Sequence, residues 1–283
     1  MRKYINDAHL AKKMGKTRRE RFAIFLDLLK LRIKRRLALA KGEECRVDLL
    51  GYEVSGFSYS ALDFLFREVF LSGEYFFETS SAKPVILDCG ANIGMSVLYF
   101  KYLFPDATIV AFEPNPNTFR LLKQNVAANG LRDVELHEIA ATDREGEISF
   151  FVSSDPGTLV GSTRSDRGGN VELKTKAGRL SKYIQAQQKI DLIKIDVEGS
   201  ELNIVNELIE SSTLRKAEQY IIEYHHRINN DPSRLADFLK QFEMNGYDYN
   251  LKANFRKPGD FQDVLIHFYR ETSVRSRRRA PHD

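Results

Sequence analysis

The chain has 283 residues, 42% of them apolar and 11% aromatic, and its 43 lysines and arginines against 39 acids give a net charge of +4. This composition predicts a globular protein with a large core, and without an apolar run of 18 residues we expect neither a membrane-spanning helix nor a secretory signal. Because Cys45 and Cys89 are too few for a disulfide framework, we expect a reducing, cytoplasmic setting.

Positive charge is concentrated near the N-terminus. Residues 1–45 hold 14 lysines and arginines against 5 acids, a net charge of +9 that leaves −5 for the rest of the chain. Apolar residues recur there at helical spacing, namely Phe22, Phe25, Leu26, Leu29, Ile33 and Leu37, with Lys30, Lys34 and Arg35 elsewhere around the helix. We expect an amphipathic basic helix that packs on the protein, alone or in a homodimer. Contact with an anionic membrane surface or with nucleic acid are the alternatives.

The segment VILDCGANIG, residues 85–94, predicts a buried strand, a glycine-rich turn and the start of a helix. Asp88, Gly90, Asn92 and Gly94 occupy this turn, where small residues let a ligand approach the backbone. The spacing is D-x-G-x-x-x-G rather than the dinucleotide pattern G-x-G-x-x-G. An acid at a strand end repels a pyrophosphate but suits an ammonium and a sulfonium, which indicates S-adenosylmethionine.

A second strand, ATIVAF, delivers Glu113 at its carboxyl end, where a carboxylate can accept hydrogen bonds from both ribose hydroxyls. Asn115 is predicted to cap the next helix, with Pro116 as its first residue and Asn129 near its end. Taken singly, Asp88 or Glu113 could equally be a ligand-binding residue or a surface or capping acid. Together, at two consecutive strand ends, they favour ligand binding.

Beyond residue 130 the alternation of elements continues. A third strand, residues 134–139, precedes the loop AATDREG, in which Ala141 and Asp143 would lie against an adenine; Asp143 could equally hold the turn before Gly146. Strands are expected at 147–153 and 171–178. The long polar loop between them offers acceptor contacts from Ser162, Thr163 and Arg164.

Two further strands end in charged residues. DLIKID, residues 191–196, precedes Glu198, with Ser200 as the predicted cap of the next helix, and QYIIEYHH covers residues 219–226. A helix ending at Gly246 and strands at 247–251 and 263–270 would close the sheet as a hairpin. We expect the basic tail, residues 271–283, to be disordered.

These motifs resemble the FkbM-type family of class I S-adenosylmethionine-dependent methyltransferases. The resemblance rests on GEYF at residues 73–76, DCGANIG, FEP, AATDREGEISF and KIDVEGSE, in that order. It implies a Rossmann-like α/β fold with a seven-stranded, mostly parallel sheet, an antiparallel last strand and helices on both faces. It places a methyltransferase domain at 73–270 behind an N-terminal helical extension at 1–72, with Glu74 and Tyr75 covering the cofactor.

The implied reaction is methylation of a hydroxyl on a sugar, glycolipid or natural-product acceptor. Methyl transfer needs an acceptor oxygen in line with the sulfonium and a way to remove the hydroxyl proton. We expect Asp196 beside the methyl group, His225 as the base, and Glu198 and Glu223 around them. A divalent metal held by these four residues is a less favoured alternative.

Two other functional classes are weighed against this one. A nucleic-acid methyltransferase would use the basic extension for phosphate contacts, but the chain lacks the proline-rich tetrapeptide with which amino-group DNA methylases hold a planar base. A non-catalytic cofactor-binding scaffold is disfavoured because the charged residues and glycines expected at the strand ends are all present. The sequence therefore favours a small-molecule or carbohydrate-like acceptor over nucleic acid.

Overall fold

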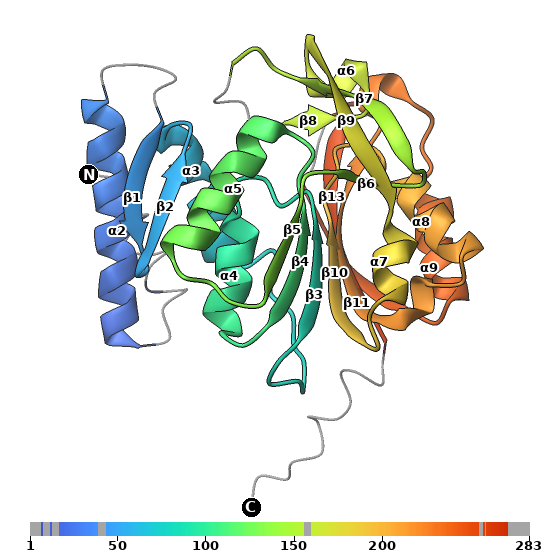
Figure 1. Cartoon of the computed structure of the whole chain (residues 1–283), viewed down its shortest axis with the longest axis horizontal. Helices are drawn as coiled ribbons and strands as arrows, with labels where there is room; N and C mark the ends of the chain where they lie inside the picture. The colour runs from blue at the N-terminus through green and yellow to red at the C-terminus, as the bar shows by residue number, and fades with distance from the viewer. Residues whose placement is uncertain are drawn as a thin grey trace, which may run out of the picture.

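The structure, a computed structural model, describes residues 7, 12, 17–38, 44–155, 160–254, 257 and 259–270, and Figure 1 shows the whole chain. The prediction for the basic tail at 271–283 lies outside the described residues. At the centre is a seven-stranded sheet in the order β12-β13-β11-β10-β3-β4-β5. Its strands are β3 (Val85–Cys89), β4 (Thr108–Phe112), β5 (Val134–His137), β10 (Ile190–Ile195), β11 (Ala217–His226), β12 (Asp248–Ala253) and β13 (Gln262–Tyr269).

The sheet is parallel except at its last strand. β13 lies antiparallel to both of its neighbours, β11 and β12, whereas the other adjacent strands pair in parallel. The carboxyl ends of β3, β4, β10 and β11 therefore meet at one edge, where ligands bind in open α/β sheets. The predicted fold class, including the antiparallel last strand, is confirmed.

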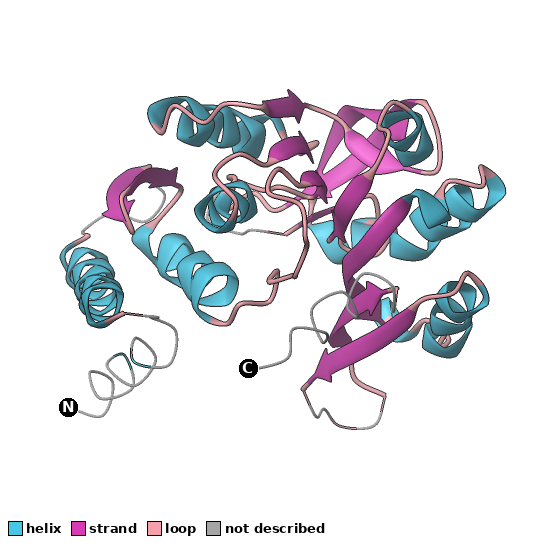
Figure 2. Ribbon diagram, turned by 90° about the horizontal axis from the view of Figure 1, so that it is seen from below, coloured by secondary structure: helices cyan, strands magenta, loops and turns pink. Residues whose placement is uncertain are grey.

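Helices cover both faces of this sheet (Figures 1 and 2). Alternate strand residues face opposite sides, so Ile86 packs in a core with α4 (Met95–Leu103) and α5 (Pro116–Ala128). Leu87 packs in the other core with α7 (Leu180–Gln185), α8 (Glu201–Glu210) and α9 (Leu235–Met244). Burial on both faces explains the continuous apolar runs that predicted these strands.

A second, four-stranded sheet lies beyond the carboxyl edge of the first (Figure 1). It consists of β6 (Ala140–Thr142), β7 (Gly146–Val152), β8 (Gly161–Ser162) and β9 (Val171–Arg179), in the order β6-β9-β7-β8, and α6 (Ser165–Gly168) follows β8. The predicted strands at 147–153 and 171–178 are confirmed. The predicted loop at 140–146 is wrong at its start, because residues 140–142 find backbone partners in β9 and become a strand.

The N-terminal part packs against α4 and α5. It contains α2 (Arg18–Leu37), β1 (Cys45–Leu49), β2 (Tyr52–Gly56), α3 (Tyr59–Leu65) and a π-helical turn, η1 (Phe66–Leu71); two 3-10 turns, η2 (Leu214–Lys216) and η3 (Ile228–Asn230), lie later in the chain. The hydroxyl of Thr17 and the carboxylate of Glu20 cap the start of α2 reciprocally. None of the helices in the described ranges is both long enough and apolar enough to cross a bilayer.

Helix α2 does pack on the protein, as predicted, and Phe25 of the predicted stripe packs against the core, but the fully buried contacts come from another face. Ile24, Leu28 and Leu31 enter the core, whereas four residues of the predicted stripe stay exposed. These four are Phe22 (63% exposed), Leu26 (42%), Ile33 (47%) and Leu37 (71%). The predicted face was wrong because α2 is apolar on two opposite sides, and periodicity alone cannot tell which side meets the core.

Candidate active site

A cavity lies at the carboxyl edge of the main sheet, between the ends of β3, β4 and β10 and the second sheet. It is lined by seven of the residues predicted from the sequence, namely Gly90, Asn92, Glu113, Asn115, Ala141, Asp196 and Glu198. Phe150, Val160 and Thr163 cover it from the second sheet and the segment beside it. The predicted turn, acids and long loop thus come together at one cavity.

The glycine-rich turn brings two strand ends into close contact. Gly90 has a φ of +83°, and a Cβ added there would lie 1.9 Å from the carbonyl oxygen of Asp196. Gly94 has a φ of +91° at the N-cap of α4, and its missing Cβ would lie 2.7 Å from Leu122. These positions need glycine for its left-handed conformation and for the room it leaves. The turn therefore exposes backbone to the cavity.

Glu113 is held in place by backbone donors. It accepts hydrogen bonds from the N–H groups of Asn92, at 3.0 Å, and Asn115, at 2.9 Å. Burial raises the pKa of its carboxyl to about 7, against the lowering effect of these two donors. Asn115 also caps α5 through its side chain, as predicted. Glu113 is thus a fixed acceptor on the wall of the cavity.

Asp88 lies behind this cavity rather than on its wall. It is completely buried, accepts a hydrogen bond of 2.5 Å from Ser96 and pairs with Lys194 at 3.3 Å. Lys194 also pairs with Asp196 at 3.5 Å and donates to the carbonyl of Gly90 at 2.7 Å. Burial lowers the pKa of this lysine, but the carboxylates of Asp88 and Asp196 outweigh burial and raise it. Lys194 therefore ties together the ends of β3 and β10.

A second cavity adjoins the first and shares Gly90, Asn92, Val160, Asp196 and Glu198 with it. It extends over Tyr75, whose hydroxyl lies 3.4 Å from Asp196, and over Glu68, Arg167, Glu223 and Asp263. Asp196 and Glu198 thus stand where the two cavities meet.

Two other predicted carboxylates line neither cavity. Glu74 pairs with Lys252 at 2.7 Å, and Asp143 binds the hydroxyl of Thr142 and the guanidinium of Arg144, at 2.9 Å each. The Arg144 hydrogen bond keeps the pKa of Asp143 below its ordinary value. Both carboxylates are engaged at the periphery of the site.

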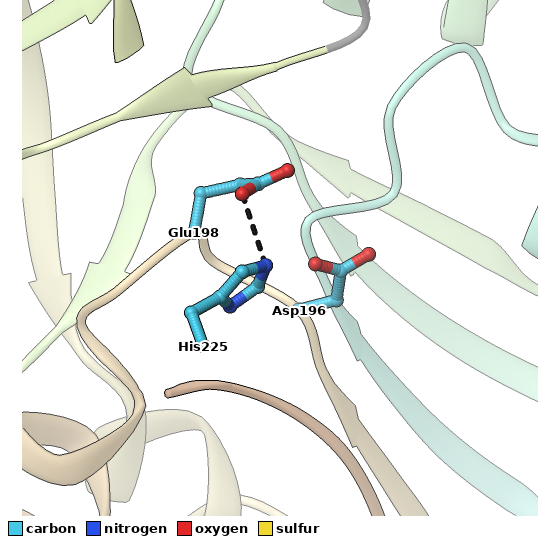
Figure 3. A group of neighbouring side chains, drawn as sticks. All are labelled: Asp196, Glu198 and His225. Carbon is cyan, nitrogen blue, oxygen red and sulfur yellow. Dashed lines mark ion pairs between the residues drawn. The ribbon is translucent and has the colours of Figure 1, made fainter. Parts of the chain in front are cut away.

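His225 is enclosed by carboxylates, and Figure 3 shows it with Glu198 and Asp196. Its Nε2 lies 2.9 Å from Glu198 and its Nδ1 lies 2.8 Å from Glu201, a residue the sequence prediction missed. Burial lowers the pKa of the imidazole, but Glu201 and Glu198 outweigh burial and raise it well above its ordinary value. Both ring nitrogens therefore face a carboxylate, which favours the charged imidazole.

Acids outnumber bases around the second cavity. Burial and the nearby Asp196 raise the pKa of Glu223 to about 9, while burial and Glu74 raise that of Glu68 to about 7. Ligand atoms of Asp196, Glu198 and His225 lie within 4.8 Å of one another, as do those of Glu223, His225 and Asp263, so either group could hold a metal ion. To serve as a metal ligand through Nε2, His225 would have to give up its contact with Glu198.

Sequence reasoning missed several lining residues that come from distant elements. Glu68 lies on η1, Arg167 on α6 and Asp263 on β13. Asp263 could have been predicted from the sequence, because an antiparallel last strand beside β11 sets Asp263 opposite His225. Arg167 lies in the long loop, but the residues proposed from that loop were its neighbours.

The three residues predicted from the long loop lie in different positions relative to the two cavities. Thr163 lines the first cavity and bonds to Ser200 at 2.6 Å, while the hydroxyl of Ser162 donates to the carbonyl of Glu198 at 2.6 Å. Ser200 precedes α8 as predicted, but its side chain does not cap the helix, because it is occupied by Thr163. Arg164 pairs with Asp166 and Asp231 outside both cavities.

Comparison with known proteins gives a consistent family match. Residues 88–249, more than half of the chain, match the sequence model described as the methyltransferase FkbM domain. Methyltransferase sdnD of Sordaria araneosa is 31% identical over 189 residues, covering 54% of this chain and 73% of the relative. Hexuronic acid methyltransferase AglP of Haloferax volcanii is 27% identical, covering 68% and 80%. The 31-O-demethyl-FK506 methyltransferase FkbM of Streptomyces tacrolimicus is 26% identical, covering 62% and 79%.

Proposed function

The chain belongs to the FkbM methyltransferase family, and from this premise we propose that it transfers the methyl group of S-adenosylmethionine to a hydroxyl of a sugar or natural-product acceptor. The observation that carries the proposal is the junction of the two cavities. The first cavity has the glycine turn and Glu113 on its wall, and the second opens from it past Asp196 and Glu198. Two relatives named for a hexuronic acid and a 31-O position support a hydroxylated acceptor.

The first cavity suits an adenosyl ligand. Glu113 is aimed by two backbone donors, and its oxygens can still accept from vicinal hydroxyls, as a ribose requires. The Gly90 turn leaves room for close approach of the ligand, and Asp196 brings a negative charge that suits a sulfonium. When bound, S-adenosylmethionine supplies an electrophilic methyl group.

The residues at the junction handle the proton of the acceptor hydroxyl. Both Arg167 Nε, at 2.7 Å, and His225 Nε2, at 2.9 Å, contact Oε2 of Glu198, which leaves Oε1 without a partner among the described residues. We propose that this Oε1 accepts the proton of the acceptor hydroxyl. His225, locked between two carboxylates, acts as a positioning residue that orients Glu198. Asp196, which lines both cavities, contacts the acceptor at the junction.

Calorimetric titration of the purified protein with S-adenosylmethionine, S-adenosylhomocysteine and NAD tests the cofactor assignment. We expect micromolar binding of both adenosyl compounds and none of NAD, because the turn carries no pyrophosphate pattern. Methyl transfer to a panel of hydroxylated sugars, followed by mass spectrometry, then tests the acceptor class. Binding of NAD alone, or of no compound, would overturn the assignment.

The raised pKa of Glu113 predicts a pH-dependent affinity. The free carboxyl is neutral well below pH 7, and ribose hydroxyls bind the ionised form more strongly, so affinity should rise as the pH increases through about 7. 5′-Methylthioadenosine is the suitable probe, since it keeps the ribose but lacks the titrating amino acid. The Glu113→Gln variant should bind it at pH 8 more weakly by roughly 1.5–3 kcal/mol and lose the pH dependence. A wild-type affinity that stays flat from about pH 5.5 to about pH 8.5 would contradict the ribose assignment.

A further inference from the structure

Helix α2 presents an apolar face to solvent, directly opposite the face that it buries. Phe22, Leu26, Ile33 and Leu37 recur four, seven and four residues apart, so at 3.6 residues per turn they lie in one stripe. Ile24, Leu28 and Leu31 lie about half a turn away and enter the core. The helix lies at the outer side of the molecule in both views (Figures 1 and 2). No described segment covers the stripe, since its side chains stay between 42% and 71% exposed.

Basic residues border this stripe at both ends. By helical position, Arg18 and Arg19 flank its beginning and Arg36 flanks its end, and all three are exposed. Within the described ranges none of the three has a carboxylate partner. The two acids of α2 point elsewhere: Glu20 caps Thr17, and the buried Asp27 accepts from the backbone of Leu50 and from Lys30. The exposed face is therefore apolar and positive, with no acid on it.

We propose that α2 docks this face onto an anionic lipid surface, lying in the plane of the interface. An apolar stripe bordered by arginines fits the boundary between acyl chains and anionic headgroups, where each basic side chain adds attraction. A second copy of the chain fits less well. Pairing two α2 helices in parallel places Arg18 against Arg18, and antiparallel pairing places it near Arg36, so either arrangement sets like charges together.

Co-sedimentation of the full-length protein with lipid vesicles tests the proposal. We expect binding to phosphatidylcholine vesicles containing about 30% phosphatidylserine, little binding to phosphatidylcholine alone, and release by roughly 0.5 M salt. Combined Leu26→Glu and Ile33→Glu substitutions should weaken binding at least about 10-fold, because they place acids in the apolar stripe. Neither residue contributes to the core, and matching near-ultraviolet circular dichroism of variant and wild type shows that the variant folds.

Two further variants separate this surface from a nonspecific effect. Met244→Glu adds the same charge at another exposed apolar side chain, on α9, and should leave vesicle binding unchanged. Combined Arg18→Gln, Arg19→Gln and Arg36→Gln substitutions should lower binding and its salt dependence. Equal binding to neutral and anionic vesicles would overturn the proposal. So would a dimer that Leu26→Glu and Ile33→Glu dissociate, with no vesicle binding, since that result assigns the stripe to a second copy.

Discussion

Replacing Gly90 with alanine is expected to reduce affinity for S-adenosylmethionine at least about 100-fold and to lower the melting temperature. The new Cβ would lie 1.9 Å from the backbone oxygen of Asp196, an approach that no real Cβ makes, at a φ of +83°. Overpacking and the left-handed conformation together cost roughly 2–5 kcal/mol. Relief would require the turn after β3 to move away from the end of β10, which carries Asn92 and its hydrogen bond to Glu113 out of position.

Gly130 offers a matched control for this change. It also has a left-handed φ, of +56°, but a Cβ there would meet nothing within 4 Å. Gly130→Ala should therefore cost only about 1 kcal/mol of stability and leave cofactor affinity unchanged. Calorimetric binding and thermal unfolding of the two variants separate the effect of the clash from that of the backbone conformation. Wild-type affinity in Gly90→Ala would show that the turn does not touch the cofactor.

The elements of the fold could be predicted because the main strands are buried on both faces. Residues 191–196 were expected as a strand, and β10 runs from Ile190 to Ile195 with all six side chains buried. Such a run leaves few alternatives for the backbone. The helix after Glu113 was equally readable, since Asn115 and Pro116 mark its start by local chemistry. Local signals and strong burial thus sufficed for the architecture.

The partners of buried charges could not be read from the sequence. Asp88 was expected to face the ligand, yet the register of β3 and β10 sets it beside Lys194, which neutralises it behind the cavity. Likewise, nothing near His225 in the chain indicates Glu201, which comes from the first turn of α8. Such pairs depend on which side chains the sheet brings together, so they follow from tertiary structure rather than from spacing.

The Glu198→Gln variant should lower kcat by about two orders of magnitude or more while leaving cofactor affinity within about 2-fold. A glutamine at this position still accepts from Arg167 and His225 through its carbonyl oxygen, so the local structure should persist. It cannot take a proton, and that is the step assigned to Oε1. Single-turnover rates with a hydroxylated acceptor, alongside calorimetric titration of S-adenosylhomocysteine, measure the two effects separately. Glu210→Gln, exposed at the end of α8, is the neutral control.

Comparing the Glu198→Gln variant with a His225→Gln variant decides whether Glu198 or His225 accepts the proton. If His225 only orients Glu198, His225→Gln should retain part of that contact and lower kcat less than Glu198→Gln does. Because Glu201 and Glu198 raise the pKa of the imidazole well above its ordinary value, the wild-type rate should show no ionisation near the ordinary histidine pKa. Near-normal turnover in Glu198→Gln, together with a loss of about 100-fold in His225→Gln, would instead make the histidine the base. The ring would then have to release Glu198 before it could accept the hydroxyl proton, and the rate would rise with pH through the elevated imidazole pKa.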